Sequence, residues 1–101
     1  MEKRRPNFPL QDLRNRCGDP ATLAITRSAL ADALTLGFDR NGIAAVIRSM
    51  KPFHFYKSMT SFRDARKWQD VYHVPWEGAV LYIKFTDDAV TAFTILSFKE
   101  R

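Results

Sequence analysis

The first half of the chain shows apolar residues at the three- and four-residue spacing of amphipathic helices. This spacing predicts three helices, over Leu10–Cys17, Ala29–Leu36 and Asp39–Met50. Ser28 and Asp39 are residue types that cap helix N-termini, so we expect them to begin the second and third helices. The third helix carries a stripe that predicts a core-facing surface, formed by Ile43, Val46, Ile47 and Met50.

Helix ends and turns are marked by glycine and proline. Gly18-Asp19-Pro20 stops the first helix, Gly37 the second and Pro52 the third. Thr22–Thr26, between the first two helices, is short enough for one brief extended segment.

From His54 onward the pattern changes to the two-residue alternation of β-strands, rich in aromatic and β-branched residues. Four runs predict strands, over His54–Ser61, Lys67–Val74, Ala79–Thr86 and Thr91–Lys99. Short connectors favour neighbouring antiparallel strands, because parallel strands need a long crossover. Helices followed by a strand meander predict an α+β fold with the helices on one face of the sheet. No repeat or linker interrupts the pattern, so we expect one domain over residues 1–101.

The same alternation predicts which polar side chains share the open face of the sheet. In Ala79–Thr86, Leu81 and Ile83 oppose Tyr82 and Lys84. Applied to the other strands, it predicts an outer surface that includes Gln69, His73, Tyr82, Lys84, Ser97 and Lys99. The first run is ambiguous, since Lys57 can belong to either face.

Composition adds a charge bias and removes several protein classes. The chain has 16 Lys and Arg against 11 Asp and Glu, a net charge of +5 that favours anionic partners such as nucleic acid. The basic N-terminal stretch suits a solvated tail and an electrostatic arm equally well. No apolar run is long enough for a transmembrane helix, and no secretory signal is visible. The single cysteine, Cys17, predicts a reducing cytoplasm.

Candidate chemistry is sparse outside the outer face. One cysteine and two separated histidines cannot give zinc-ligand spacing, and Asp87-Asp88 suits a turn better than a metal site. Cys17 beside Gly18 suits a small buried hydrophobe better than a nucleophile. The outer face itself fits either an ordinary solvated surface or a phosphate-binding platform of lysine, tyrosine and glutamine. His73 is the better acid–base candidate of the two histidines.

Several segments together resemble the MqsR toxins, the motility quorum-sensing regulators of bacterial type II toxin–antitoxin systems. They run in order along the chain as Met1-Glu2-Lys3-Arg4, Thr26-Arg27-Ser28-Ala29-Leu30, Phe55-Tyr56-Lys57-Ser58-Met59-Thr60, Trp68-Gln69-Asp70-Val71-Tyr72, Tyr82-Ile83-Lys84 and Ser97-Phe98-Lys99-Glu100. The resemblance implies the RelE-like microbial ribonuclease fold. It also implies a metal-independent endoribonuclease that cleaves mRNA at GC-containing sites, typically GCU, without the ribosome.

The resemblance further implies a partner and a set of catalytic residues. The partner is an MqsA-like antitoxin that carries its own zinc and binds DNA, so we expect no cofactor here and only an indirect link to DNA. The implied catalytic residues are Lys57, Gln69, Tyr82 and Lys99. We expect the neighbouring Lys84, His73 and Ser97 to bind the RNA, and the general base and general acid stay unassigned.

Two other functions remain open from the sequence. The chain could be a non-catalytic protein that binds its antitoxin and acts in transcriptional autoregulation. A DNA-binding regulator acting alone would need a reading helix, for which Asp39–Met50 offers Arg40, Asn41 and Arg48.

Overall fold

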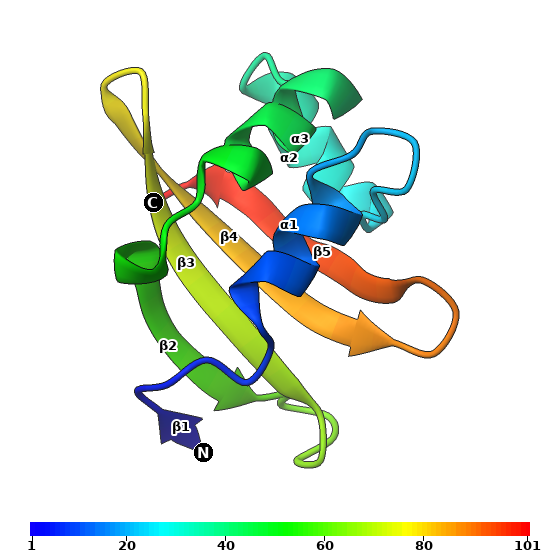
Figure 1. Cartoon of the computed structure of the whole chain (residues 1–101), viewed down its shortest axis with the longest axis vertical. Coiled ribbons are helices and arrows are strands. Elements are labelled where there is room, and N and C mark those ends of the chain that lie inside the picture. Colours follow the sequence, from blue (N-terminus) through cyan, green and yellow to red (C-terminus); the bar gives the residue numbers. More distant parts are fainter.

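The computed structural model describes residues 1–101 and joins three helices to a five-stranded antiparallel sheet (Figure 1). The helices are α1 (Leu10–Cys17), α2 (Arg27–Thr35) and α3 (Arg40–Ser49), with a 3₁₀ turn at Pro52–His54. The strands are β1 (Glu2–Lys3), β2 (Phe55–Thr60), β3 (Trp68–Trp76), β4 (Ala79–Asp88) and β5 (Ala92–Glu100). They lie side by side in chain order. The predicted α+β fold is confirmed.

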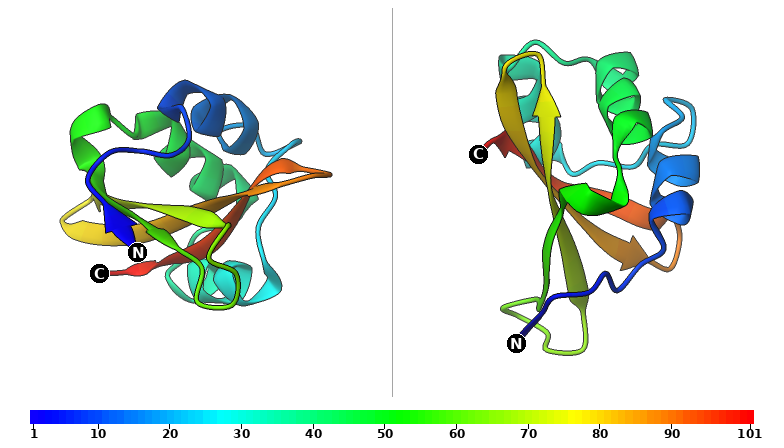
Figure 2. Two further views of the ribbon diagram at one scale, coloured as in Figure 1. Left: turned by 90° about the horizontal axis from the view of Figure 1, so that it is seen from below. Right: turned by 60° about the vertical axis from the view of Figure 1, so that its left-hand side comes forward.

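The hydrophobic core lies between the sheet and the helices α1 and α3 (Figure 2). All four residues of the predicted stripe, three in α3 and Met50 directly after it, are fully buried, as the spacing predicted. The sheet contributes the inward-facing side chains of β3, β4 and β5, namely Tyr72, Val74, Leu81, Ile83, Phe85, Ile95 and Phe98. Alternation along these strands therefore leaves their other face free for function.

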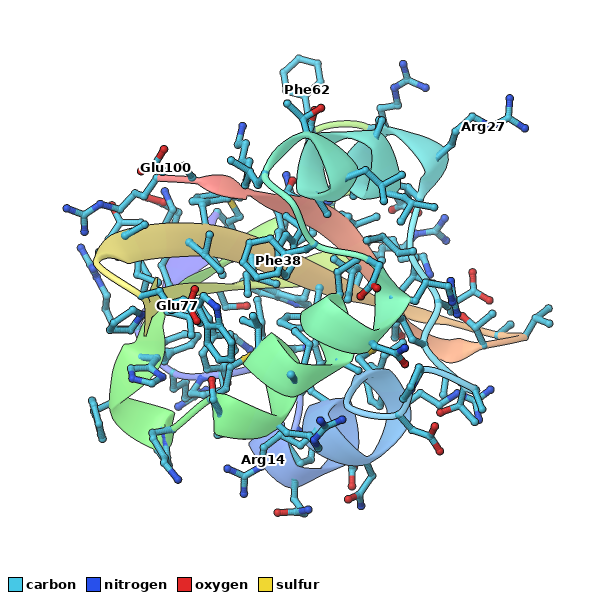
Figure 3. All side chains as sticks on the ribbon, turned by 90° about the horizontal axis from the view of Figure 1, so that it is seen from above. Arg14, Arg27, Phe38, Phe62, Glu77 and Glu100 are labelled. Atoms are coloured by element: carbon cyan, nitrogen blue, oxygen red, sulfur yellow. The ribbon has the colours of Figure 1, made fainter.

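Helix α2 lies alongside β5, and Figures 2 and 3 show it across that strand from α3. The predicted cap is wrong by two residues, because the Thr26 hydroxyl, and not that of Ser28, accepts from the Ala29 N–H. Thr26 is the last residue of the predicted short extended segment. Ile25 in this segment forms a parallel β-bridge with Ile95 of β5. The chain is still extended at Thr26, which gives that residue the backbone conformation a cap needs.

The β3–β4 connection is tighter than the predicted four-residue turn. Pro75 and Trp76 belong to β3, which leaves Glu77 and Gly78 as a two-residue loop. Both loop residues have positive φ, 48° and 86°, the combination that matches the twist of a hairpin. Pro75 is tolerated because β2 pairs with β3 only as far as Tyr72, so the edge beside Pro75 needs no donor.

Strand β1 was not predicted. Because it pairs with β2, the basic N-terminal stretch does not begin as a free, solvated tail. Glu2 and Lys3 pair with Met59 and Ser58 of β2, and the Lys3 ammonium lies 4.2 Å from the Trp68 ring centroid. Asn7 and Phe8 follow β1, and their backbone N–H groups donate hydrogen bonds to the buried carboxylate of Asp70. The N-terminal segment is thus held to the sheet at both ends.

Candidate active site

The outer face of the sheet brings all the predicted site residues together in cross-strand rows. His73 of β3 pairs with Tyr82 of β4, and Tyr82 pairs with Lys99 of β5. The next row is Val71, Lys84 and Ser97, and Gln69 opens a third row beside Thr86. Val71 is fully buried although it faces outward, so the longer side chains around it cover the floor of the site.

A β-bulge in β2 determines where Lys57 points. Phe55 pairs with Tyr72 and Lys57 with Val71, so Tyr56 is an extra residue between the two pairs. Phe55 packs against the core with its ring edge on Tyr72, whereas Tyr56 and Lys57 both face outward. The alternation rule failed for this strand because a bulge turns two consecutive side chains to one face.

Three rings and one ammonium form a continuous row across four strands. Tyr56 stacks on His73 at 4.2 Å between centroids, and His73 lies 5.8 Å from Tyr82. The Lys99 ammonium completes the row at 5.4 Å from the Tyr82 centroid. Such a row can stack bases and hold phosphates along one strand of nucleic acid.

Lys57 forms an ion pair with Glu2 of β1, with the lysine side chain 24% exposed and the glutamate 57%. The hydrogen bond from Lys57 lowers the pKa of Glu2, and the same bond raises the pKa of Lys57. The raised pKa favours the ammonium form of Lys57, which suits charge stabilisation better than proton abstraction.

The other ionisable groups of the face shift in different directions. Burial, and then the charge of Lys99, lowers the pKa of Lys84. Burial raises the pKa of Tyr82 although Lys57 opposes it, which keeps the phenol protonated and able to donate. Burial and the Arg101 guanidinium lower the pKa of His73, which favours a neutral imidazole at neutral pH.

A concavity of about 550 Å³ adjoins the rows at the β2–β3 loop. Its walls include Met59, Gln69 and Lys84, together with Phe62 from the loop. The Phe62 ring is fully exposed and projects away from the body of the protein (Figure 3). A pocket of this size beside an amide and an ammonium can hold a planar, polar ring.

Several candidates from the sequence lie elsewhere and have structural roles. Cys17 is fully buried, and burial raises the pKa of its thiol to about 11, which rules out a thiolate nucleophile. Nδ1 of His54 accepts from the Lys51 N–H at the 3₁₀ turn. Arg40 and Arg48 of α3 donate to the carbonyls of Leu23 and Gly18, so they tie loops to the helix and do not form a reading surface. Nowhere do three His, Cys, Asp or Glu side chains gather in a metal-binding group.

The structure adds four residues to those expected from the sequence. Glu2, Tyr56 and Arg101 contact the predicted residues, and Phe62 borders the concavity. Tyr56 and Glu2 stand inside the quoted segments, but neither alternation nor spacing could place them, because a bulge and a two-residue strand decide their positions.

Comparison with known proteins identifies a family. Residues 5–100 match the family model described as "Motility quorum-sensing regulator, toxin of MqsA". The chain is also 38% identical to the mRNA interferase toxin MqsR of Escherichia coli (strain K12), over 101 residues and the full length of both chains. None of the helices is long and apolar enough to cross a membrane.

Proposed function

The chain belongs to the MqsR toxin family, and on that basis we propose that it is the toxin of a bacterial toxin–antitoxin pair that cleaves mRNA as an endoribonuclease. The observation that carries the proposal is the row of Tyr56, His73, Tyr82 and Lys99 with Lys57 beside it. It offers aromatic faces for bases and ammonium groups for phosphates on a single surface.

The reaction is an attack by the RNA's own 2′-hydroxyl on the adjacent phosphorus. It leaves a 2′,3′-cyclic phosphate and a 5′-hydroxyl, and it needs no metal because lysines carry the compensating charge. Lys57 stabilises the phosphorane oxygens, a role that suits an ammonium whose pKa is raised by Glu2. Tyr82 donates a proton toward the leaving 5′-oxygen, a role that suits a phenol whose pKa burial raises.

The remaining residues hold the RNA in register. Lys99, over the Tyr82 ring, binds the phosphate, and Gln69 positions the nucleotide at the mouth of the concavity. Lys84, His73 and Ser97 contact the strand on either side of the scissile bond. We place a base next to the cut in the concavity beside Phe62, and we propose that this contact underlies a preference for GC-containing sites.

The partner is an MqsA-like antitoxin, which matches the family description as a toxin of MqsA. Contact with DNA is then indirect, through the antitoxin. The substrate places the protein in the cytoplasm, and the reaction requires no ribosome, because the proposed contacts are all with a single RNA strand.

The experiment is cleavage of a defined single-stranded RNA by the purified protein in EDTA, with the products' ends identified. The wild-type protein should give cyclic-phosphate ends, and Lys57→Ala and Lys99→Ala should each lose at least about 100-fold in rate. A matched control is Lys51→Ala, an exposed lysine at the 3₁₀ turn, which should cleave like the wild type. Intact RNA with folded wild-type protein would favour the non-catalytic, antitoxin-binding function instead.

A further inference from the structure

The ion pair between Glu2 and Lys57 places a carboxylate at the lysine to which the proposed function assigns the scissile phosphate. We propose that Glu2 is the general base of the cleavage reaction, taking the proton of the 2′-hydroxyl while Lys57 holds the phosphate. This inference rests on the proposed function, and it fills the one catalytic role for which that function has no residue.

The position of Glu2 on the sheet supports this role. Glu2 pairs with Met59, so it points to the same outer face as Lys57 and Gln69. Two other carboxylates, Asp32 and Glu100, border a hollow beside Lys99 at the opposite edge of the face. Neither forms an ion pair with Lys99, whereas the Glu2 carboxylate contacts Lys57 directly.

The two proposed proton-transfer groups lie on either side of Lys57 in the sheet order. In an in-line displacement the attacking and leaving oxygens lie on opposite sides of the phosphorus. Glu2 lies on β1 and Tyr82 on β4, with Lys57 between them close enough to affect the pKa values of both. A base at one side and a phenol at the other match that requirement.

Glu2 accepts the proton of the 2′-hydroxyl, a bond forms between O2′ and phosphorus, and the bond between phosphorus and O5′ breaks. Tyr82 gives its proton to O5′ and regains one from water, and Glu2 releases its proton to water. The products are the 2′,3′-cyclic phosphate and the free 5′-hydroxyl.

The charged groups around Glu2 keep it ionised in the free protein. Lys57 faces it from β2, and Arg4 and the α-amino group of Met1 face it from its own segment. The α-amino group also donates to the Thr60 hydroxyl. When RNA binds, the phosphate brings a negative charge next to Lys57, and that charge raises the proton affinity of Glu2 at the moment the base is needed.

The test compares full-length wild type, Glu2→Gln and Glu2→Asp in cleavage of one RNA and in binding of its 2′-O-methyl analogue, which has no 2′-hydroxyl. Glu2→Gln should lower kcat at least about 100-fold, and Glu2→Asp should keep part of the activity. Binding of the analogue should stay within about threefold, because an exposed ion pair contributes little. The residual rate of Glu2→Gln should rise about tenfold per pH unit, since hydroxide is then the remaining base.

The matched control is Glu77→Gln, which removes one negative charge at the β3–β4 turn and should cleave like the wild type. If wild type cleaves and Glu2→Gln cleaves equally well or binds the analogue much more tightly, Glu2 merely competes with the phosphate for Lys57, and the inference is wrong. If wild type itself leaves RNA intact, the proposed function fails, and the role of Glu2 fails with it.

Discussion

The Tyr56 ring lies almost flat on the His73 imidazole, with 20° between the two planes and 4.2 Å between their centroids. The stack depends on the β2 bulge, which turns Tyr56 toward the outer face beside Lys57. The Tyr56 side of the stack is partly open, since this residue remains 41% exposed. A base of the RNA can therefore extend the stack without displacing either ring.

Replacement of Tyr56 by alanine should weaken RNA binding by about 1–3 kcal/mol, because base–aromatic stacking contributes that much per base. Tyr56→Phe keeps the ring and should bind almost normally. The measurement is the dissociation constant for a 2′-O-methyl RNA oligonucleotide at one fixed salt concentration. The control is Phe53→Ala, another exposed aromatic residue, which lies on the 3₁₀ turn. Equal binding by Tyr56→Ala and wild type would remove this ring from the RNA path.

Lys84 should contribute one phosphate contact. The salt dependence of the RNA binding constant measures such contacts. For single strands the logarithm of the binding constant falls with the logarithm of salt concentration by about 0.7 per phosphate contacted. Lys84→Gln should therefore make this slope shallower by about 0.7. A titration of the same oligonucleotide at several salt concentrations measures it. Lys51→Gln should leave the slope unchanged, and an unchanged slope for Lys84→Gln would mean that Lys84 makes no phosphate contact.

Asp70→Asn should destabilise the protein and loosen its N-terminal segment. The fully buried carboxylate accepts hydrogen bonds from Asn7 N–H, Phe8 N–H and the Ser58 hydroxyl. The NH2 group of asparagine can only donate, so it would face one or more of these donors without an acceptor. We expect a loss of about 2–3 kcal/mol in the free energy of unfolding, measured with urea.

Asp39→Asn is the matched substitution. Asp39 caps α3 by accepting from Gly42 N–H, and asparagine caps helices about as well as aspartate, so this variant should lose only a few tenths of a kcal/mol. Hydrogen exchange at residues 2–8 should rise in Asp70→Asn alone. Similar losses in both variants would contradict an anchoring role for Asp70.

Acid should destabilise the protein in part through His73. Its folded-state pKa lies below the ordinary 6.5, so the folded protein favours the neutral ring and the unfolded chain binds protons first. The stabilising contribution is complete above 6.5 and is lost as the pH falls through the lower folded value. The melting temperature of wild type should therefore drop as the pH falls below about 6.5, and that of His73→Gln should drop less.

His54 has a lowered pKa as well, from burial and Lys51, so His54→Gln should also flatten the curve and the double variant should flatten it most. Glu2 and Asp88 have lowered pKa values too, but their contributions disappear only below their ordinary values of 4.5 and 3.8. The two pH windows are thus distinct. A His73→Gln variant as acid-sensitive as wild type would show that the ring titrates freely.

Periodicity predicted most of the fold because the elements it describes are regular. The apolar stripe of α3 and the alternation in β4 each repeat often enough to show their period. The stripe and the inward-facing residues of β4 are buried as expected. The exceptions are local. Thr26 caps α2 in place of Ser28 because the pairing of Ile25 with β5 keeps the chain extended at that point.

The site was harder to predict than the fold, for reasons that lie in two short features. The bulge at Tyr56 breaks the alternation of β2, so the face of Lys57 could not be read from parity. Strand β1 has two residues, too few to show any period, and its position depends on Asp70 some 63 residues away from Asn7. The family resemblance identified Lys57 as a candidate residue. Its contact with Glu2 became visible only in the folded sheet.

The row from Tyr56 to Lys99 takes one side chain from each of four neighbouring strands. Partial opening of the sheet that detaches any one of these strands therefore dismantles the site while much of the helical layer stays folded. The fraction of molecules that can act is then set by the least stable strand pairing rather than by the global stability of the chain. Enzymatic rate in this protein becomes a sensitive reporter of local unfolding, well below the temperature at which the whole domain melts.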